Sequence, residues 1–345
     1  MTELALYRKY RPATFQDVVG QDHVVKALQG ALKEKNVAHA YLFYGSRGTG
    51  KTSVARIFAG EIGAHDSDVH EIDAATYTGV DNIRALREEA AVMPFESERK
   101  VYIVDEVHML SKGAFNAFLK LLEEPPSHVT FILATTELEK VPDTIQSRCQ
   151  VFTFKKPTAK AIAETVTKIA KAEGYTLDKA AAELIAILAD GSFRDSQSVL
   201  QKVLSASSDK KITVEEVATI TGAPKSEVIA HIIEGLSSGD GAKALGAVGE
   251  AVKGNSDIAV LLMILIDRMR MLLMLRYAPK VGEEMVADLA DTEQMFLKEL
   301  AKDAQSKINS ETLRKLLVAT IETARSPVPQ LPLELAIMEL CGAEK

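Results

Sequence analysis

The residues with the clearest chemical potential form a glycine-rich stretch, GSRGTGKT, at residues 45–52. The stretch fits the pattern Gly-x-x-x-x-Gly-Lys-Ser/Thr, in which backbone N–H groups turn inward around phosphate oxygens. A β-forming run, AYLFYG, precedes it and a helical pattern follows, so the loop would lie at a helix N-terminus that favours anions. In this setting a chance glycine-rich turn is a poor alternative. The residues expected to contact phosphate are Gly45, Ser46, Arg47, Gly48, Thr49, Gly50, Lys51 and Thr52.

The last two residues of this loop and two nearby acids predict a hydrolytic site. Lys51 would contact the β- and γ-phosphates of a nucleoside triphosphate, and the Thr52 hydroxyl would bind Mg²⁺. A second apolar run, KVYIVDE at residues 100–106, ends in two carboxylates. Asp105 would hold the same Mg²⁺ through water, and Glu106 would polarise the attacking water as a base. Both acids could instead cap the next helix, but their pairing with the phosphate loop favours hydrolysis.

A hydroxyl and an arginine are further candidates with less support. Thr136 ends the apolar run VTFILATT and could hydrogen-bond the γ-phosphate or the attacking water. Without further context a helix cap or turn residue is the better interpretation. Arg148, in TIQSRCQVF, lies nearly a hundred residues from the phosphate loop. From the residues alone it is an ion-pair partner more readily than a phosphate ligand, and Cys149 beside it is a small buried residue.

The elements that must position these residues are buried strands separated by helices. Nearly continuous apolar strands are expected where helices cover both faces of a parallel sheet, which predicts a doubly wound α/β domain. The expected strands are at residues 40–45, 69–73, 100–106, 129–136 and 150–154.

The remainder of the chain is predicted to be helical. From Pro157 the pattern changes to amphipathic helices alone, beginning with a cap at Thr158, and Gly222 and Pro224 mark a boundary. The sequence therefore predicts three parts: an α/β domain at 1–155, a small helical domain at 156–222 and a larger helical domain at 223–345.

Composition limits the class of protein and its compartment. The 345 residues are 47% hydrophobic and 26% charged, which is typical of a globular protein with two or three domains. A net charge of −7 provides no global attraction for nucleic acid, so any such binding would need a local basic surface. Two cysteines, no apolar leader and no apolar run long enough to span a membrane predict a cytoplasmic protein that makes no membrane contact.

In order and spacing, the phosphate loop, DEVH, ATTE, SRC and GSFRD resemble the AAA+ clamp-loader ATPases. More narrowly, the chain is similar to the gamma/tau family of bacterial DNA polymerase III. The resemblance extends from residue 7 to 340, although residues 225–325 support it mainly by helical character. It implies an α/β AAA+ (P-loop NTPase) core with a parallel sheet, a small helical lid domain and an all-α collar domain. The closest stretches are YRKYRPATFQDVVGQ (7–21), EIDAAT (71–76), KVYIVDEVHMLSKGAFNAFLKLLEEPP (100–126) and SPVPQLPLELAIMEL (326–340).

The resemblance implies residue roles that spacing alone does not. Thr136 matches the sensor-1 position, and Arg194 matches sensor 2, which reaches the γ-phosphate from the lid. Arg148 matches an arginine finger that reaches the γ-phosphate of a neighbouring subunit. Without the family, Arg194 would be a surface arginine paired with Asp195, and the N-terminal segment an ordinary helix and loop. Residues that would pack around adenine are Tyr7, Arg8, Pro12, Val18 and Val19.

The implied activity is that of an ATP-driven motor subunit that loads a sliding clamp onto primed DNA. The implied partners are delta-type and delta-prime-type subunits, copies of the chain itself, the clamp and primer–template DNA. Arg84, Lys112 and Lys120 are candidates for contacts to the DNA phosphate backbone, and ordinary solvated charges are an equal alternative. Because the chain stops at Lys345, the expectation is a short form of the family or a truncated chain.

One departure from the family concerns zinc. Relatives usually carry a four-cysteine zinc module before the EIDAA strand, and the corresponding FAGEIGAHDSDVHEIDAAT is too short and has no cysteine. His65, His70, Asp66 and Asp68 are better interpreted as a solvated loop than as a substitute site, so no structural zinc is expected. The same gap resembles the zinc-less small subunits of archaeal and eukaryotic clamp loaders, which remain an alternative.

Two other functional classes remain open at this point. The first is a non-catalytic scaffold or stator subunit with a vestigial nucleotide site, against which the intact Lys51, Thr52, Asp105, Glu106 and Arg148 argue. The second is a different AAA+ enzyme such as a Holliday-junction motor, which offers no reason for SRC or the SPVPQLP tail.

Overall fold

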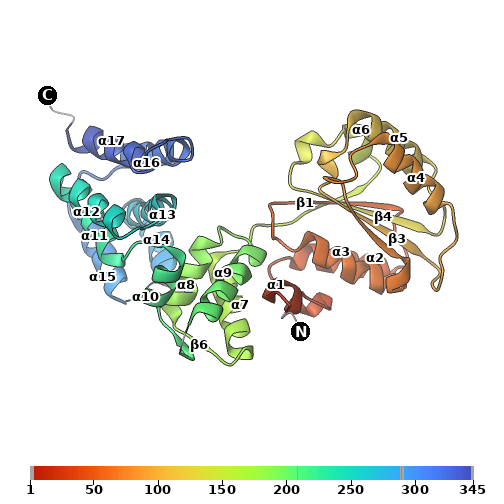
Figure 1. The fold of residues 1–345 in the computed structure, drawn as a ribbon, viewed down its shortest axis with the longest axis horizontal. Helices are drawn as coiled ribbons and strands as arrows, with labels where there is room; N and C mark the ends of the chain where they lie inside the picture. The colour runs from red at the N-terminus through yellow and green to blue at the C-terminus, as the bar shows by residue number, and fades with distance from the viewer. Residues whose placement is uncertain (1–3, 208, 288, 290, 343–345) are drawn as a thin grey trace. The chain divides into compact units, whose positions relative to one another are not determined.

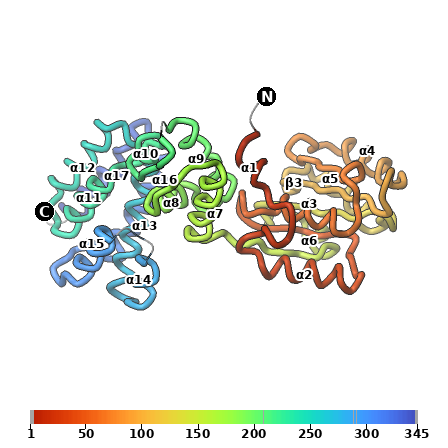
Figure 2. The backbone as a smooth tube through the Cα atoms, turned by 90° about the horizontal axis from the view of Figure 1, so that it is seen from below, coloured from red at the N-terminus to blue at the C-terminus, as the bar shows by residue number. Residues whose placement is uncertain are grey.

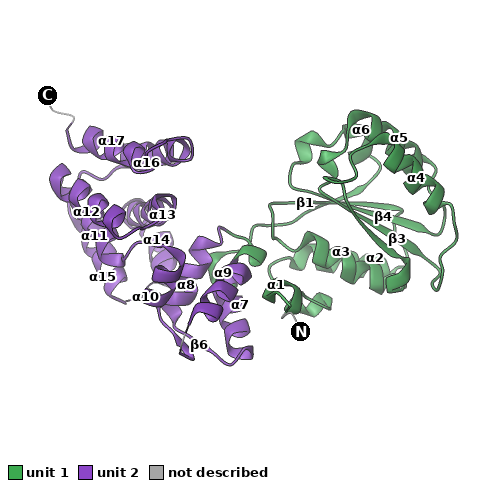
Figure 3. Ribbon diagram, viewed as in Figure 1, with its two compact units in different colours: residues 1–161, 191–195 green, residues 162–190, 196–345 purple. Residues whose placement is uncertain are grey.

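The computed structural model describes residues 4–207, 209–287, 289 and 291–342. The chain divides into two compact units, shown in Figure 3. The first comprises Met1–Ala161 and Gly191–Asp195, and the second comprises Ile162–Asp190 and Ser196–Lys345. The division into three parts that the sequence suggested stays a prediction.

The first unit is built on a five-stranded sheet with the order β2-β3-β4-β1-β5, in which every neighbouring pair is parallel. All five predicted strands are confirmed, with ends that differ by a residue at most. The strand β4 is buried along its whole length, and β1 and β3 are buried at every residue but the last, because helices cover both faces of the sheet (Figure 1). The strands are β1 (Ala40–Tyr44), β2 (Val69–Asp73), β3 (Lys100–Asp105), β4 (Val129–Thr135) and β5 (Gln150–Thr153).

Alternate side chains of each strand enter two separate cores, as the period of a strand requires. On β1, Leu42 packs into a core with residues of α4 and α5, while Tyr41 and Phe43 pack into a core with residues of α2 and α3. The helices of this unit are α1 (Leu6–Lys9), α2 (Asp22–Lys33), α3 (Lys51–Glu61), α4 (Val80–Ala90), α5 (Lys112–Glu123) and α6 (Asp143–Gln146). The 3₁₀ turns are η1 (Phe15–Asp17), η2 (Asp66–Asp68), η3 (Val107–Met109) and η4 (Leu138–Lys140).

The second unit is mainly helical (Figure 2), and two of its helices, α7 and α9, begin with residues of the first unit. The predicted cap of α7 is confirmed, because Thr158 Oγ1 accepts a hydrogen bond from Ala161 N at 3.2 Å. The helices are α7 (Ala159–Ala172), α8 (Lys179–Leu188), α9 (Phe193–Ala206), α10 (Val214–Thr221), α11 (Ser226–Ser238), α12 (Gly241–Lys253), α13 (Ile258–Tyr277), α14 (Pro279–Val286), α15 (Asp291–Lys302), α16 (Ser310–Thr323) and α17 (Leu331–Cys341).

The expectation of helices alone after Pro157 is wrong in one respect. Two short strands, β6 (Thr176–Leu177) and β7 (Lys211–Ile212), pair in parallel. Strands of two residues are too short to show the alternation by which a strand is recognised in sequence. Among the described residues, no helix is both long and apolar enough to cross a membrane.

A buried carboxylate organises the segment where the zinc module was expected to be missing. Asp68, at the end of η2, is 1% exposed and accepts hydrogen bonds from three successive backbone N–H groups, those of Phe95, Glu96 and Ser97, at 2.6, 2.9 and 2.9 Å. The Ser97 hydroxyl donates a fourth bond at 2.6 Å. Asp68 therefore joins the α3–β2 connection to the α4–β3 connection and is not part of the solvated loop that the sequence suggested.

The Asp68 contacts predict a specific acid sensitivity. The hydrogen bond from Ser97, together with those from the backbone, holds the pKa of Asp68 well below its ordinary value. A depressed pKa in the folded state stabilises the protein above the unfolded-state pKa of about 4, and this contribution is lost as the pH falls from there toward the lower folded value.

We therefore expect Asp68→Asn to lower the melting temperature at pH 7, and the difference from wild type to shrink below about pH 4. Thermal unfolding followed by circular dichroism across this pH range measures it. Asp66→Asn is the matched control because Asp66 is exposed on the same turn. Equal effects of the two variants at pH 7 would contradict the assignment.

Candidate nucleotide-binding site

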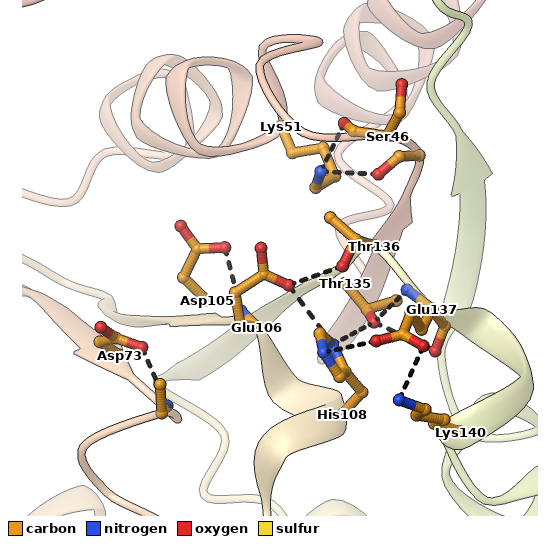
Figure 4. Close-up of polar contacts among 12 residues, drawn as sticks. Ser46, Lys51, Asp73, Asp105, Glu106, His108, Thr135, Thr136, Glu137 and Lys140 are labelled. Atoms are coloured by element: carbon orange, nitrogen blue, oxygen red, sulfur yellow. Dashed lines mark hydrogen bonds and ion pairs between the residues drawn. The ribbon is translucent and has the colours of Figure 1, made fainter. Parts of the chain in front are cut away.

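The phosphate loop connects β1 to α3, and its lysine is buried. Lys51 is the first residue of α3 and is 6% exposed. Its Nζ donates to the carbonyl oxygens of Gly45 at 2.7 Å and Ser46 at 2.9 Å (Figure 4). Burial lowers the pKa of Lys51, while the carboxylates of Glu106 and Asp105 act in the opposite direction. A lysine ammonium has three donors, so this geometry can also serve an anion above the loop.

The tip of the loop is held by a segment from far along the chain. Gly48 has φ +72°, and a Cβ there would lie 2.0 Å from Ser192 Oγ, so this position requires glycine for both conformation and space. Phe193 N donates to the Gly48 carbonyl at 3.0 Å. The GSFRD segment lies within the predicted small helical domain at 156–222, and its residues Gly191–Asp195 group with the α/β unit.

A buried amide that sequence reasoning missed fixes the other side of the loop. Gln21 is 1% exposed, and its Nε2 donates to the carbonyls of Thr49 at 3.3 Å and Lys155 at 2.8 Å. Its Oε1 accepts from Lys155 N at 3.0 Å. Gln21 therefore ties the phosphate loop to the residues after β5. Gln21 directly precedes α2, and its side chain makes no capping hydrogen bond to that helix.

The two predicted metal-binding groups lie next to each other at the carboxyl ends of the strands. Thr52 Oγ1 donates to Asp105 Oδ2 at 2.9 Å, and Asp105 Oδ1 accepts from Glu106 N at 3.0 Å. A hydroxyl and a carboxylate are the hard oxygen ligands that Mg²⁺ prefers, and they converge here from α3 and β3. The residues present therefore fit Mg²⁺, with Thr52 and Asp105 as the groups that could hold it.

The second acid adopts an unusual backbone conformation. Glu106 has φ 48° and ψ 45°, in the left-handed region that residues other than glycine seldom occupy. Such a conformation costs about 1–2 kcal/mol and persists only where surrounding contacts enforce it. Thr136 Oγ1 donates to Glu106 Oε2 at 3.1 Å. The structure thus joins the two residues directly, although the sequence had left Thr136 as a possible cap or turn residue.

Two further residues at this edge of the sheet, His108 and Glu137, were not singled out from the sequence. His108, on η3, lies between the carboxylates of Glu106 and Glu137, as Figure 4 shows. Its side chain is 7% exposed. The only sequence signal for His108 was its position in the DEVH motif, two residues after Glu106.

The predicted arginine finger has intrachain partners in this structure. Arg148 Nη2 lies 2.7 Å from Glu123 Oε1, and Nη1 donates to the Thr144 carbonyl at 2.8 Å. This is the ion pair that the residues alone suggested, and the role in a neighbouring site stays a prediction. Burial raises the pKa of the adjacent Cys149 thiol to about 12, as expected of a packed and unreactive cysteine.

The predicted sensor-2 arginine contacts the N-terminal segment. The guanidinium carbon of Arg194 lies 4.9 Å from the ring centroid of Tyr7, and that of Arg8 lies 5.8 Å from the same ring. A hydrogen bond and the charge of Arg8, together with Arg194, lower the pKa of Tyr7. Of the other predicted adenine contacts, Pro12 is half-buried, Val18 packs against the core formed with α2 and α3, and Val19 is 40% exposed.

The predicted DNA contacts and the predicted lack of a structural zinc site both stay predictions. Arg84, Lys112 and Lys120 are exposed on α4 and α5, and Arg84 pairs with Asp81 at 3.0 Å. In the part of the chain that the structure describes, no group of three or more His, Cys, Asp or Glu side chains is placed to hold a metal ion.

Comparison with known proteins places this site in a family. A family model described as "DNA polymerase III, delta subunit" matches residues 20–75 and 63–158. The chain is 40% identical over 362 residues to the DNA polymerase III subunit tau of Bacillus subtilis, covering 99% of this chain and 64% of the relative. It is 33% identical to the tau subunit of Escherichia coli, covering 98% of this chain and 55% of that protein.

The chain belongs to the gamma/tau family of DNA polymerase III. A further member, the gamma/tau subunit of Mycobacterium tuberculosis, is 38% identical over 83% of this chain and 53% of its own length. The chain thus spans between about half and two thirds of the length of these gamma/tau relatives.

Solved structures confirm the AAA+ fold of this gamma/tau chain. The Thermotoga maritima RuvB Holliday junction branch migration motor superposes with a TM-score of 0.55 and 19% identity, covering 89% of this chain and 98% of that protein. Because the identity is so low, this likeness shows the fold alone and does not favour a Holliday-junction activity. The predicted AAA+ core with a parallel sheet, followed by helical regions, is confirmed.

The buried amide of Gln21 gives a direct test of how the loop is held. Gln21→Ala would leave the Lys155 N–H and two carbonyls without their side-chain partner, so we expect a loss of about 1–3 kcal/mol in unfolding free energy. Nucleotide affinity should fall as well, because Thr49 would lose one of its restraints. Urea unfolding and titration with a fluorescent ATP analogue measure the two effects.

Gln16→Ala is the matched control because Gln16 is exposed on η1. Unchanged stability and affinity in Gln21→Ala would contradict the proposed restraint.

Proposed function

We propose that this protein is an ATP-driven motor subunit of a DNA polymerase III clamp loader, which binds and hydrolyses ATP to load a sliding clamp onto primed DNA. The observation that carries this proposal is the convergence of Lys51, Thr52, Asp105 and Glu106 at one edge of the sheet, in a chain 40% identical to a DNA polymerase III subunit tau. The AAA+ fold and the phosphate loop support nucleotide binding.

The residues of the site would divide the work of hydrolysis. Residues 45–52 would enclose the phosphates, with the Lys51 ammonium on the β- and γ-phosphates. Mg²⁺, when bound at Thr52 and Asp105, neutralises phosphate charge and orients the oxygens. Glu106 would accept the proton of the attacking water, and Thr136 would hold the Glu106 carboxylate through its hydroxyl. Arg194 would read the γ-phosphate, while Tyr7, Arg8, Pro12, Val18 and Val19 would surround adenine.

The proposed partners follow from the family and not from any contact in this structure. They are delta-type and delta-prime-type subunits, further copies of this chain, the sliding clamp, and primer–template DNA held by its phosphate backbone. Arg84, Lys112 and Lys120 are proposed for the DNA contacts because they are exposed on α4 and α5. Such a complex would work in the cytoplasm.

The two rival classes predict different behaviour of the nucleotide site. A non-catalytic stator would need neither the strained backbone of Glu106 nor the hydrogen bond from Thr136 to its carboxylate, so this geometry supports an active site. A zinc-less small subunit of the archaeal or eukaryotic type would share the same chemistry, but the gamma/tau relatives support the bacterial type.

Removal of the buried ammonium tests the catalytic assignment. Lys51→Ala should weaken ATP binding and reduce DNA-stimulated hydrolysis by the reconstituted complex by at least 100-fold, because no other described cation contacts the loop carbonyls at this position. The measurement is phosphate release with clamp and primed DNA present. Full activity in Lys51→Ala would overturn the assignment.

Arg148 tests whether the site is shared between subunits. Arg148→Ala should leave ATP binding to the isolated chain within about twofold of wild type, and lower hydrolysis by the assembled complex by about 10³-fold. Glu123→Ala is the informative control, because it removes the intrachain partner and leaves the arginine in place.

If Arg148 only formed an ion pair with Glu123, the two variants would behave alike. Loss of ATP binding by isolated Arg148→Ala would show that the arginine serves its own subunit.

A further inference from the structure

The side chain behind the Glu106 carboxylate is His108, and both of its ring nitrogens face oxygen atoms. Nδ1 lies 3.3 Å from Glu106 Oε2 and 3.0 Å from Thr135 Oγ1. Nε2 lies 3.2 Å from Glu137 Oε1. The ring is 7% exposed, so water competes little for these contacts. Figure 4 shows the row of side chains from Glu106 through His108 to Glu137 and Lys140.

Each ring nitrogen of His108 faces a group that can accept a hydrogen bond. The Thr135 hydroxyl donates to the Glu137 carbonyl at 3.2 Å and accepts from Glu137 N at 3.0 Å. Nδ1 faces Glu106 Oε2 and Thr135 Oγ1, and Nε2 faces Glu137 Oε1. An imidazole N–H can donate to a carboxylate from either side of the ring, so the one ring lies in contact with the carboxylates of both Glu106 and Glu137.

The far end of the row is fixed to a surface segment. Glu137 Oε2 lies 2.7 Å from Lys140 Nζ, and the hydrogen bond from Lys140 is the main cause that lowers the pKa of Glu137. Glu137 thus remains a carboxylate that can accept from His108. Gln146 Nε2 donates to the carbonyls of Leu138 at 3.2 Å and Val141 at 2.8 Å, so side-chain hydrogen bonds join α6 to η4. This segment, residues 137–148, ends at Arg148.

Thr136 and His108 both contact one oxygen of the Glu106 carboxylate. Thr136 Oγ1 lies 3.1 Å from Glu106 Oε2, the same oxygen that faces His108 Nδ1. Oε1 takes part in neither of these two contacts. The left-handed backbone of Glu106 sets the direction of the side chain, and the two contacts at Oε2 restrict its rotation.

We propose that His108 is a positioning residue for Glu106, and that through Glu137 and Lys140 it makes the orientation of this carboxylate depend on the segment 137–148. The inference rests on the proposed ATPase function. A displacement of this segment would move Glu137, draw His108 with it and turn Glu106 away from the water, without any change in the groups that bind the nucleotide. A purely structural histidine would instead support the fold and affect binding and turnover alike.

The test compares steady-state hydrolysis by the reconstituted complex for wild type, His108→Ala, His108→Gln and Lys140→Ala. We expect His108→Ala to lower kcat about 10- to 100-fold while KM and ATP affinity stay within about threefold, because a misplaced base affects only the chemical step. His108→Gln retains one donor group and should recover part of kcat.

Lys140→Ala is the sharper variant because the Lys140 side chain is 58% exposed and reaches the buried His108 ring only through Glu137. We expect a several-fold loss of kcat in the wild-type background and no further loss in the His108→Ala background, since coupled residues are not additive. Lys33→Ala, an exposed lysine of α2, is the matched control and should have no effect in either background.

The kcat values of these variants decide whether His108 positions Glu106. Unchanged kcat in folded His108→Ala, or equal losses from Lys140→Ala with and without His108, would overturn the inference and leave the ATPase function standing. A wild-type complex that does not hydrolyse ATP would overturn the proposed function together with this inference. Should His108→Ala fail to fold, His108→Gln and Lys140→Ala carry the same comparison.

Discussion

The constraint on which the nucleotide site depends is the burial of a positive charge. The Lys51 ammonium is 6% exposed, and its hydrogen bonds go to the neutral carbonyls of Gly45 and Ser46. A buried charge without full compensation is costly, and here the burial lowers the lysine pKa. The polyphosphate of a nucleotide would supply the missing negative charge. Two contacts hold the phosphate loop around this lysine. The Gln21 amide donates to the Thr49 carbonyl, and Phe193 N donates to the Gly48 carbonyl.

A parallel sheet then brings the chemically active groups to one edge. Asp105 is the last residue of β3, Thr136 directly follows β4, and the phosphate loop follows β1, so all three lie at the same edge of the sheet. Local strain is concentrated there as well, since Glu106 is held in a left-handed conformation by its neighbours. The His108 row extends this edge toward the segment that ends at Arg148. The proposed base, Glu106, is thus linked through His108 and Glu137 to the segment 137–148. The proposed finger, Arg148, is the last residue of that segment.

Much of this could be predicted from local sequence. The five strands, the phosphate loop and the Thr52–Asp105 pairing follow from apolar runs that end in a few functional residues. Gln21, His108 and Glu137 were missed because their roles depend on contacts across 28 or more residues, or on atoms that only folding brings together. The contact of Gly191–Asp195 with the phosphate loop could not be predicted, because helix periodicity does not show which residues the start of a helix contacts. Asp68 was taken for a solvated acid, since four donors around one carboxylate leave no local pattern.

We propose that a complete ATPase site is shared between subunits. The rate of ATP hydrolysis per chain, measured as a function of chain concentration with and without delta-type subunits, clamp and primed DNA, tests this proposal. We predict very slow turnover for the dilute isolated chain, whose own Arg148 is paired with Glu123, and strong stimulation on assembly. Rapid turnover by a dilute monomer, unchanged when the partners are added, would contradict the claim.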